Sequence, residues 1–314
     1  MDRIKIIVLF SLAALLGQPS RLLTAQRAQP YAPTQGYRAF LPIALNQPTR
    51  IAVIGDFGLA GAPAAAVANL VISWQPQYIV TTGDNNYYTG LASTIDQNIG
   101  QYYADFIHPY FGSYPAPHNP GFNRFFPAIG NHDWNSADGY AAHLNYFTLP
   151  GHERYYDVLL GPVHWFILNS DSHEPDGITP TSAQAQWLQN KLAASTACWQ
   201  IVVLHHAPYS SSAVHGSTPA TQWPYATWGV DVVIAGHDHT YERLSRDGIV
   251  YLVNGIGGAP LYAFGLPIAG SVVRYNADYG ALRIDATASC LRFDLLNTAS
   301  VAVDSFELTG GCAW

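Results

Sequence analysis

Polar side chains that can bind metal ions follow several apolar segments of this chain. The clusters are Asp56, Asp84 with Tyr87, Asn131 with His132 and Asp133, His205 with His206, and His237 with His239. Carboxylate, amide and imidazole groups without thiolates suit hard or borderline cations, not copper(I) or iron–sulfur clusters. The set is large enough for two ions, and one carboxylate can bridge two ions about 3.5–4 Å apart, as in displacement at phosphorus.

Each cluster by itself also has an ordinary structural explanation. An aspartate after a strand commonly caps a turn or a helix, and a single histidine is usually a hydrogen-bonded polar group. His237 and His239 are more specific, because alternate residues of an extended segment point to the same side. Several clusters at equivalent positions favour one shared site over unrelated turns.

The segments that precede these clusters have the composition of strands buried on both faces. Near-continuous apolar runs cover residues 51–56, 78–84, 125–133, 165–171, 199–206 and 230–239. Residues 63–74 and 181–194 have helical character, so strands and helices alternate as in a parallel sheet with crossovers. Residues 249–254, 280–286, 290–296 and 301–308 resemble antiparallel strands. Open α/β sheets bind ligands at the carboxyl ends of their strands, where the clusters lie.

Composition limits the classes of partner. The 314 residues are 49% hydrophobic and 11% charged, with a formal net charge of −7. That is enough apolar material for one large α/β domain or two ordinary ones. The two lysines and the scattered arginines form no basic patch, so we expect no binding to a nucleic-acid backbone. An anionic substrate would need its positive charge from metal ions.

The N-terminus has the pattern of a secretory signal peptide. Arg3 and Lys5 precede an apolar run at residues 6–16, and residues 23–25 offer a cleavage site. An uncleaved anchor is the alternative, but the run is shorter than the roughly 20 residues of a spanning helix. We therefore predict a signal peptide at 1–25, a proline-containing linker at 26–48 and a single catalytic domain at 49–310. The protein is expected to be secreted or periplasmic, with no stable membrane anchor after cleavage.

The chain has three cysteines, which are too few for a disulfide framework. Export would permit one bridge with one thiol left over. The weakly favoured pair is Cys290 with Cys312, and Cys198 is then the remaining thiol.

Taken in order, five motifs resemble the metal-ligand blocks of the calcineurin-like metallophosphoesterases. They read GDFG, GDNNYY, GNHD, HHAP and GHDH, and the similarity extends over roughly residues 50–310. The usual first block is Asp-x-His, whereas this chain has Gly58 where that histidine would stand. Residues 83–87 are similar to the Gly-Asp-x-x-Tyr block of the purple acid phosphatases, in which a tyrosinate takes the histidine's place. The resemblance implies an α/β, four-layer sandwich of two mixed β-sheets flanked by helices, with the metal site at the carboxyl ends of the strands.

The resemblance also implies two metal positions. The first would take Asp56, Asp84, Tyr87 and His239, and the second would share Asp84 and add Asn131, His206 and His237. His206 is preferred because the family block reads His-x-Pro, which matches residues 206–208. His205 is then expected to pack beneath the ligands.

Tyr87 bears on which metal is bound. A free tyrosine has a pKa near ~10, so coordination requires an ion acidic enough to displace the phenol proton. Ferric iron does so readily, whereas magnesium or calcium hardly does. The sequence therefore predicts Fe3+ in the Tyr87 position and Fe2+, Zn2+ or Mn2+ in the other. A tyrosine that merely packs on its loop is the alternative.

The resemblance further implies attack on phosphorus by a metal-bound hydroxide, with His132 as the proton donor to the leaving oxygen. Asp133 would orient His132, or would cap a helix instead. His215 resembles the substrate-facing histidine of purple acid phosphatases, and His132 could also be structural. Arg243 is expected to form an ion pair rather than bind phosphate.

These observations predict a secreted binuclear phosphoesterase that hydrolyses small-molecule phosphate monoesters. A phosphodiesterase or nucleotide hydrolase on the same metal core stays open, because specificity depends on the loops at 108–124, 134–155 and 209–229. A non-catalytic binding protein on a phosphatase scaffold is less favoured, since such scaffolds usually lose ligands and here every ligand block is filled.

Overall fold

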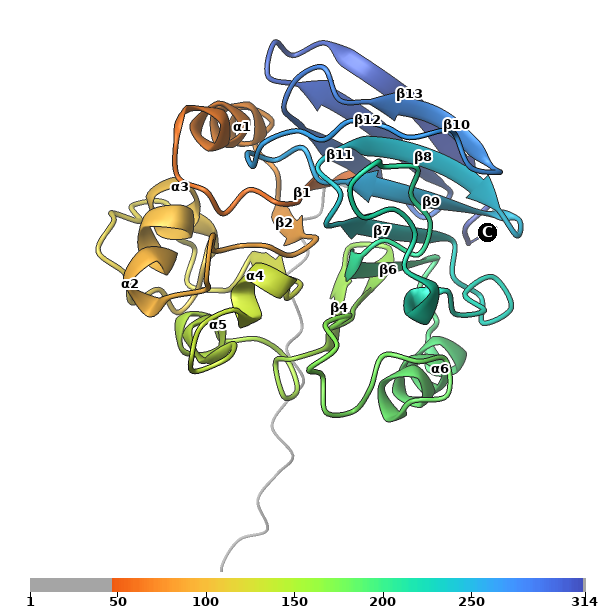
Figure 1. Ribbon diagram of the computed structural model, residues 1–314, viewed down its shortest axis with the longest axis horizontal. Helices are drawn as coiled ribbons and strands as arrows, with labels where there is room; N and C mark the ends of the chain where they lie inside the picture. Colours follow the sequence, from red (N-terminus) through yellow and green to blue (C-terminus); the bar gives the residue numbers. More distant parts are fainter. Residues whose placement is uncertain (1–46, 313–314) are drawn as a thin grey trace, which may run out of the picture. The chain divides into compact units, whose positions relative to one another are not determined.

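The computed structural model describes residues 47–312. The predicted signal peptide, and all of the predicted linker except residues 47 and 48, lie outside the described residues. Within residues 47–312 the chain forms two β-sheets that pack against each other, with helices on their outer sides (Figure 1). No helix of this part of the chain is both long and apolar enough to cross a membrane.

The first sheet has six strands in the order β13-β12-β11-β1-β2-β3. Their bounds are β1 Thr49–Ile54, β2 Tyr78–Thr81, β3 Phe125–Pro127, β11 Gly280–Ala286, β12 Cys290–Asn297 and β13 Ala302–Thr309. Strands β1, β2 and β3 are parallel, and β11 joins β1 in antiparallel register with Ile51 opposite Ile284. The sheet is therefore mixed.

The second sheet has seven strands in the order β10-β8-β9-β7-β6-β5-β4. Their bounds are β4 Tyr156–Leu160, β5 Val163–Ile167, β6 Trp199–His206, β7 Val232–Gly236, β8 Tyr241–Arg246, β9 Ile249–Asn254 and β10 Ser271–Tyr275. Strands β5, β6, β7 and β9 are parallel to their neighbours within this group, and β4, β8 and β10 are antiparallel additions at the two ends. These three antiparallel strands were not predicted from the sequence.

Alternation along the strands sorts the core into two clusters. Ile201 and Val203 of β6 belong to the large core shared by the two sheets, whereas Val202 and Leu204 belong to a second core under a helix. This period of two is expected where both faces of a strand are buried. The fold of two mixed sheets flanked by helices is thus confirmed.

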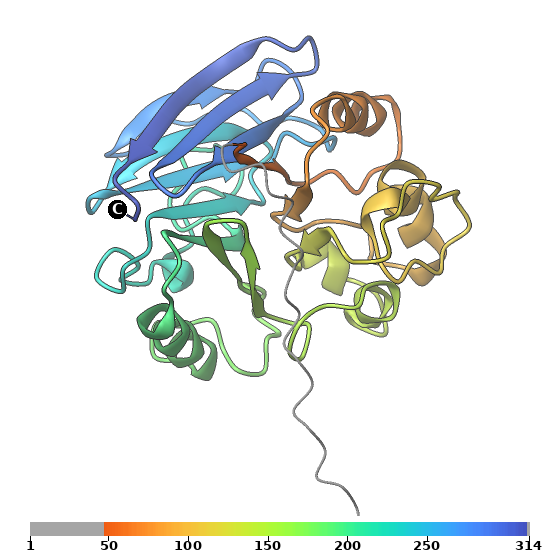
Figure 2. The same ribbon diagram turned by 180° about the vertical axis from the view of Figure 1, so that it is seen from behind.

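Helices cover the outer faces. The longer ones are α1 Ala62–Ser73 and α6 Ala183–Ala194, and the shorter ones are α2 Ala92–Ile95, α3 Gln101–Tyr103, α4 Asn131–Trp134 and α5 Ala141–Tyr146. Short π and 3-10 turns, η1 Asp96–Gly100, η2 Ala104–Phe106 and η3 Pro219–Thr221, complete the set. Figure 2, seen from behind, places α1 and α6 on opposite sides of the sheets, as Figure 1 does. Ser182 precedes helix α6, and its hydroxyl accepts from the Ala185 amide at 3.2 Å and caps the first turn.

One ion pair joins the two sheets. Arg243 on β8 lies 2.7 Å from Asp304 on β13, and the Tyr241 hydroxyl donates to the same carboxylate at 2.8 Å. The predicted role of Arg243 as an ion-pair partner is confirmed.

The structure corrects the predicted disulfide. Cys198 is bonded to Cys312, and Cys290 is a free thiol. Cys290 lies opposite Thr309 in the register of β12 and β13, so β13 ends before it reaches Cys312. The segment after β13 then passes next to Trp199, at the start of β6. Cys312 therefore forms its disulfide with Cys198 and not with Cys290 of the adjacent strand β12.

His143 on α5 makes the fold sensitive to acid. Its side chain is buried, and neither ring nitrogen has a hydrogen-bond partner among residues 47–312. Burial lowers the pKa of His143 to about 3. The unfolded chain binds a proton below about pH 6.5, whereas the folded chain does not until about pH 3, so stability falls as the pH drops through this window.

We expect wild-type protein to lose about 2 kcal/mol of unfolding free energy at this residue between pH 7.5 and pH 5. His143→Phe should remove that loss, and urea unfolding of the metal-free protein at both pH values measures it. His152→Phe changes an exposed histidine and serves as the control. An equal acid sensitivity in His143→Phe and wild type would contradict the assignment.

Candidate metal centre

The predicted ligand clusters meet where strands of both sheets end. Asp56 follows β1 and Asp84 follows β2, while His237 follows β7 of the second sheet. All three have a left-handed backbone, with φ of 54°, 54° and 71°. This conformation costs a non-glycine residue roughly 1–2 kcal/mol, and such strain clusters at functional sites.

Hydrogen bonds hold these turns in place. The His237 amide donates to Oδ2 of Asp56 at 3.0 Å, and the His132 amide donates to Oδ1 of Asp84 at 2.9 Å. Both carboxylates are buried. The carboxylates of Asp56 and Asp84 therefore hold the backbone around the site in place, and they are also candidate metal ligands.

Tyr87 points into the first group of ligands. Its hydroxyl oxygen lies 3.0 Å from Oδ2 of Asp84, 3.3 Å from Oδ1 of Asp56 and 3.0 Å from Nε2 of His239. The tyrosine does not pack away on its loop. In the chain without metal, burial and the two carboxylates raise the pKa of Tyr87 above its usual value.

His205 lies at the centre of the second group. Its Nε2 is 3.0 Å from Oδ1 of Asn131, 3.4 Å from Oδ2 of Asp84 and 3.2 Å from Nδ1 of His237. Asp56, Asp84 and His205 each offer a ligand atom within 4.8 Å of the others. Asp84 thus takes part in both groups, in the position expected of a bridging carboxylate.

The two adjacent histidines lie differently with respect to Asp84, and His206 also lies beside a predicted ligand, with its ring centre 4.4 Å from that of His237. The family resemblance predicts His206 among the ligands and His205 beneath them. In the structure it is His205 that faces Asp84, whereas Nδ1 of His206 lies 3.0 Å from the hydroxyl of Ser170.

Backbone carbonyl groups set the tautomers of two of these histidines. Nδ1 of His205 lies 2.8 Å from the carbonyl oxygen of Thr82, and Nδ1 of His239 lies 2.7 Å from that of Pro260. A carbonyl only accepts, so the hydrogen-bond network assigns a proton to Nδ1, and Nε2 is the atom that faces the site and would bind a metal. This is the arrangement that metal-binding histidines require.

The buried carboxylates lack a permanent positive partner. Within residues 47–312 the ion-pair partners of Asp56 and Asp84 are histidines, and neither carboxylate meets a lysine or arginine. Burial alone would raise the pKa of Asp84, but His205 and His132 bring it below its usual value. The Asp84 carboxylate in turn raises the pKa of His205 to about 10, against the effect of burial. In the chain without metal, protonated histidines supply the positive charge beside these carboxylates. Metal ions could supply that charge instead, because carboxylate oxygens and imidazole nitrogens converge at the site.

His132 is held at the edge of the site. Its Nδ1 lies 2.7 Å from the carbonyl oxygen of Tyr88, and its Nε2 lies 4.0 Å from Oδ2 of Asp84. The ring is partly exposed, with its centre 4.4 Å from that of Tyr87. His132 can therefore present Nε2 to a bound molecule.

Asp133 does not orient His132, so this prediction is corrected. Its carboxylate accepts from the Gly130 amide at 2.8 Å and from the side-chain amide of Asn85 at 2.9 Å. The alternative prediction, that Asp133 caps a helix, is the one that agrees with these hydrogen bonds, because they stabilise the start of α4. Asp133 acts on the site through the loop that carries Asp84.

His215 and Tyr262 form part of the rim. The His215 ring stacks on His237 with 4.0 Å between ring centres, and its side chain is exposed. Tyr262 stacks on His239, also at 4.0 Å, and the sequence analysis did not identify it. No motif marks Tyr262, because it reaches the site from the loop after β9 through tertiary packing alone.

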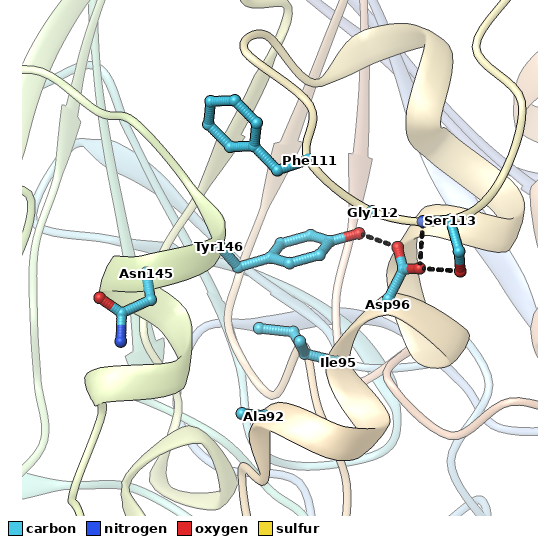
Figure 3. A pocket seen from close by; sticks show the side chains of 8 residues that line it. All are labelled: Ala92, Ile95, Asp96, Phe111, Gly112, Ser113, Asn145 and Tyr146. Carbon is cyan, nitrogen blue, oxygen red and sulfur yellow. Dashed lines mark hydrogen bonds between the residues drawn. The ribbon is translucent and has the colours of Figure 1, made fainter.

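A separate cavity of about 430 Å³ lies between α2, α5 and the loop at 111–113 (Figure 3). Its carboxylate, Asp96, accepts from Tyr146 at 2.8 Å, from Tyr110 at 2.6 Å and from the amide and hydroxyl of Ser113 at 2.8 and 2.7 Å. Both oxygens are thus engaged by the chain itself.

Gly130 shows how tightly the centre is packed. A Cβ atom at this position would lie 2.2 Å from both the amide nitrogen and Oδ1 of Asp84. We expect Gly130→Ala to displace Asp84, to lower metal content and to destabilise the fold by about 1–3 kcal/mol. Gly61→Ala is the matched control, since Gly61 also precedes a helix but its Cβ would meet nothing closer than 3.9 Å. Metal analysis and thermal unfolding of both variants test this, and full metal content in Gly130→Ala would contradict it.

Residues 49–241 match the family model described as calcineurin-like phosphoesterase. The chain belongs to this family. Within the family it is similar to purple acid phosphatases. It is 26% identical over 248 residues to purple acid phosphatase 15 of Arabidopsis thaliana, a match that covers 68% of this chain and 46% of that protein. It is 24% identical over 246 residues to tartrate-resistant acid phosphatase type 5 of Mus musculus, a match that covers 66% of this chain and 72% of that protein.

Solved structures of this phosphoesterase family show the same fold. A purple acid phosphatase from yellow lupin (Lupinus luteus) seeds superimposes with a TM-score of 0.66 at 18% identity, over 83% of this chain and 53% of that one. The chain thus spans about half the length of the Arabidopsis and lupin proteins. Together these matches identify a purple acid phosphatase-like member of the calcineurin-like phosphoesterases.

Proposed function

We propose that this protein is a binuclear metal-dependent phosphatase that hydrolyses phosphate monoesters. The observation that carries the proposal is the convergence of two ligand groups on one buried carboxylate, Asp84, with Tyr87 on one side and His205 on the other. The first ion would be held by Asp56, Asp84, Tyr87 and His239, and the second by Asp84, Asn131, His205 and His237. When bound, the two ions supply positive charge to the phosphoryl group and a water acidic enough to attack phosphorus.

The phenol supports the choice of Fe3+ for the first position. Tyr87 is buried between two carboxylates that oppose its ionisation, so only a strongly acidic cation displaces its proton. The second position, with amide and imidazole donors, suits Fe2+, Zn2+ or Mn2+.

The chain's own residues would handle the leaving group. His132 is fixed through Nδ1, and its Nε2 faces the site, so a proton there can pass to the leaving oxygen. His215 is stacked on His237, where it would contact the phosphoryl group.

The test is an assay of purified protein on a panel of phosphate monoesters and diesters, beside metal analysis of the same preparation. We expect about two ions per chain, hydrolysis of monoesters in preference to diesters, and loss of both activity and metal on chelation. A metal-free chain that hydrolyses the panel as fast as the loaded one would reject the proposal.

Export is proposed as part of this function. The predicted signal peptide directs the chain out of the cytosol, and the bond between Cys198 and Cys312 suits an oxidising compartment. The mass of the mature protein, recovered from medium or periplasm, tests it, and an intact N-terminus would argue against cleavage.

A further inference from the structure

Glu242 is a carboxylate in the interior of the fold without a basic partner. It lies on β8, three residues after His239, and it is fully buried. Among residues 47–312 no lysine, arginine or histidine forms an ion pair with it, and the adjacent Arg243 pairs with Asp304 instead. Burying a carboxylate is costly unless hydrogen bonds compensate, so its hydrogen-bond partners indicate what it does.

The partners of the Glu242 side chain are two serines from different loops. Oε2 accepts from the Ser211 amide at 2.7 Å, and Oε1 accepts from the Ser211 hydroxyl at 2.6 Å and from the Ser271 hydroxyl at 2.5 Å. Ser211 lies in the loop after β6, and Ser271 begins β10, directly after the loop that carries Tyr262. One carboxylate therefore holds both loops against β8.

The loop at 207–218, which follows β6, carries His215. The His215 side chain is exposed, and its ring stacks on His237 with 4.0 Å between ring centres. The His215 amide donates to Asp238 at 3.3 Å, which is a longer bond than those between Ser211 and the buried carboxylate. The direction of His215 therefore depends on the path of its loop, and that path is held most firmly at Ser211.

The two loops are also hydrogen-bonded to each other. The Ala213 amide donates to the carbonyl oxygen of Ala263 at 2.9 Å, and the Gly265 amide donates to that of Ser211 at 2.8 Å. These bonds fix the register of one loop against the other. Ser211 takes part in them and in the bonds to Glu242, so it is the residue through which the carboxylate sets the position of the loop.

We propose that Glu242 is a positioning residue for substrate binding, which holds the loop at 207–218 through Ser211 so that His215 faces the phosphoryl group. The inference rests on the proposed function, in which His215 contacts that group. The loop requires hydrogen-bond acceptors and not a charge, since every partner of Glu242 is a neutral donor. A loosened loop would let the ring leave His237, and substrate binding would weaken while the metal content stays unchanged.

The principal test compares Glu242→Leu with Glu242→Gln. Leucine leaves the Ser211 amide and both hydroxyls without their acceptor. KM for 4-nitrophenyl phosphate and the inhibition constant of inorganic phosphate should therefore rise roughly three- to tenfold, with the metal content of wild type. Glutamine should restore most of this, because its oxygen can accept from the amide and its NH2 group can donate to hydroxyls, which also accept. Equal losses in the two variants would overturn the proposal.

Ser211→Ala tests the same link while keeping the buried carboxylate. It removes one hydrogen bond to Glu242 and should raise both constants in the wild-type background but not in His215→Ala, because a positioning residue acts only through its partner. Ser305→Ala is the control, since the Ser305 hydroxyl also donates to a carboxylate, that of Asp294 at 2.7 Å, but lies on β13. Unchanged constants in Ser211→Ala, or effects that add to those of His215→Ala, would reject the role.

Hydrogen exchange of the metal-free protein tests the inference without any activity. Amides at 207–218 should exchange faster in Glu242→Leu than in wild type, and at nearly the wild-type rate in Glu242→Gln. Unchanged exchange in Glu242→Leu would show that the carboxylate does not hold the loop. Failure of the proposed function is distinct from this result, because it shows in wild type as absent metal or absent hydrolysis.

Discussion

Asp84→Asn is expected to lower kcat by about three orders of magnitude or more. Oδ2 of Asp84 lies 3.0 Å from the hydroxyl of Tyr87 and 3.4 Å from Nε2 of His205, so one carboxylate serves both ligand groups. The amide keeps the shape of the side chain but removes the charge on which both ions depend. Preorganised charge of this kind is usually the largest contribution to such catalysis.

Asp247→Asn is a closely matched control. Asp247 has φ of 55°, almost the same left-handed conformation as Asp84 at 54°, but it is exposed in the turn between β8 and β9. The control therefore makes the same chemical change in the same backbone conformation, without the site. Steady-state kinetics and metal analysis of both variants separate the effects. Turnover near that of wild type in Asp84→Asn would argue against a shared carboxylate.

Tyr87→Phe is expected to bleach the protein while leaving its fold intact. A tyrosinate bound to ferric iron absorbs visible light, so iron-loaded wild type should be violet or pink. The substitution removes only a hydroxyl that meets Asp56, Asp84 and His239, and it leaves the ring in place. The variant should therefore lose the visible band and bind iron less tightly, with an unchanged circular dichroism spectrum.

Tyr262→Phe provides the comparison for this result. Tyr262 stacks on His239, but its hydroxyl is not among the groups that meet Asp56 or Asp84, so its loss should leave the colour unchanged. The prediction is tested by the visible absorption and iron content of wild type, Tyr87→Phe and Tyr262→Phe. An uncoloured wild type reconstituted with iron would reject the ferric assignment, though hydrolysis with other metals could persist.

The order of the metal-binding motifs and the main strands could be predicted from the sequence. The segments that end at Asp56, Asp84 and His206 were predicted as strands, and β1, β2 and β6 occupy them. This succeeded because parallel strands buried on both faces are almost wholly apolar, and polar residues can follow only where such strands end. The tyrosine motif was likewise readable, because a phenol three residues after an aspartate has no role in an ordinary turn.

The antiparallel strands of the second sheet were harder to predict. β4, β8 and β10 are antiparallel additions with partly exposed patterns, and β8 begins only two residues after His239. Their formation depends on a neighbouring strand that offers hydrogen bonds, not on a pattern of their own.

Tertiary structure alone decided which of several adjacent polar residues takes which role. His205 and His206 differ by one position, and on a strand that difference exchanges the two faces of the sheet. Asp133 could have formed a hydrogen bond with His132 or capped the start of α4, and in the structure its carboxylate accepts from Asn85 and the Gly130 amide. Cys312 could have met either remaining cysteine until the path of the chain after β13 was known. Spacing along the chain determines which groups are present near the site, whereas the direction of each side chain depends on partners that are far away in the sequence.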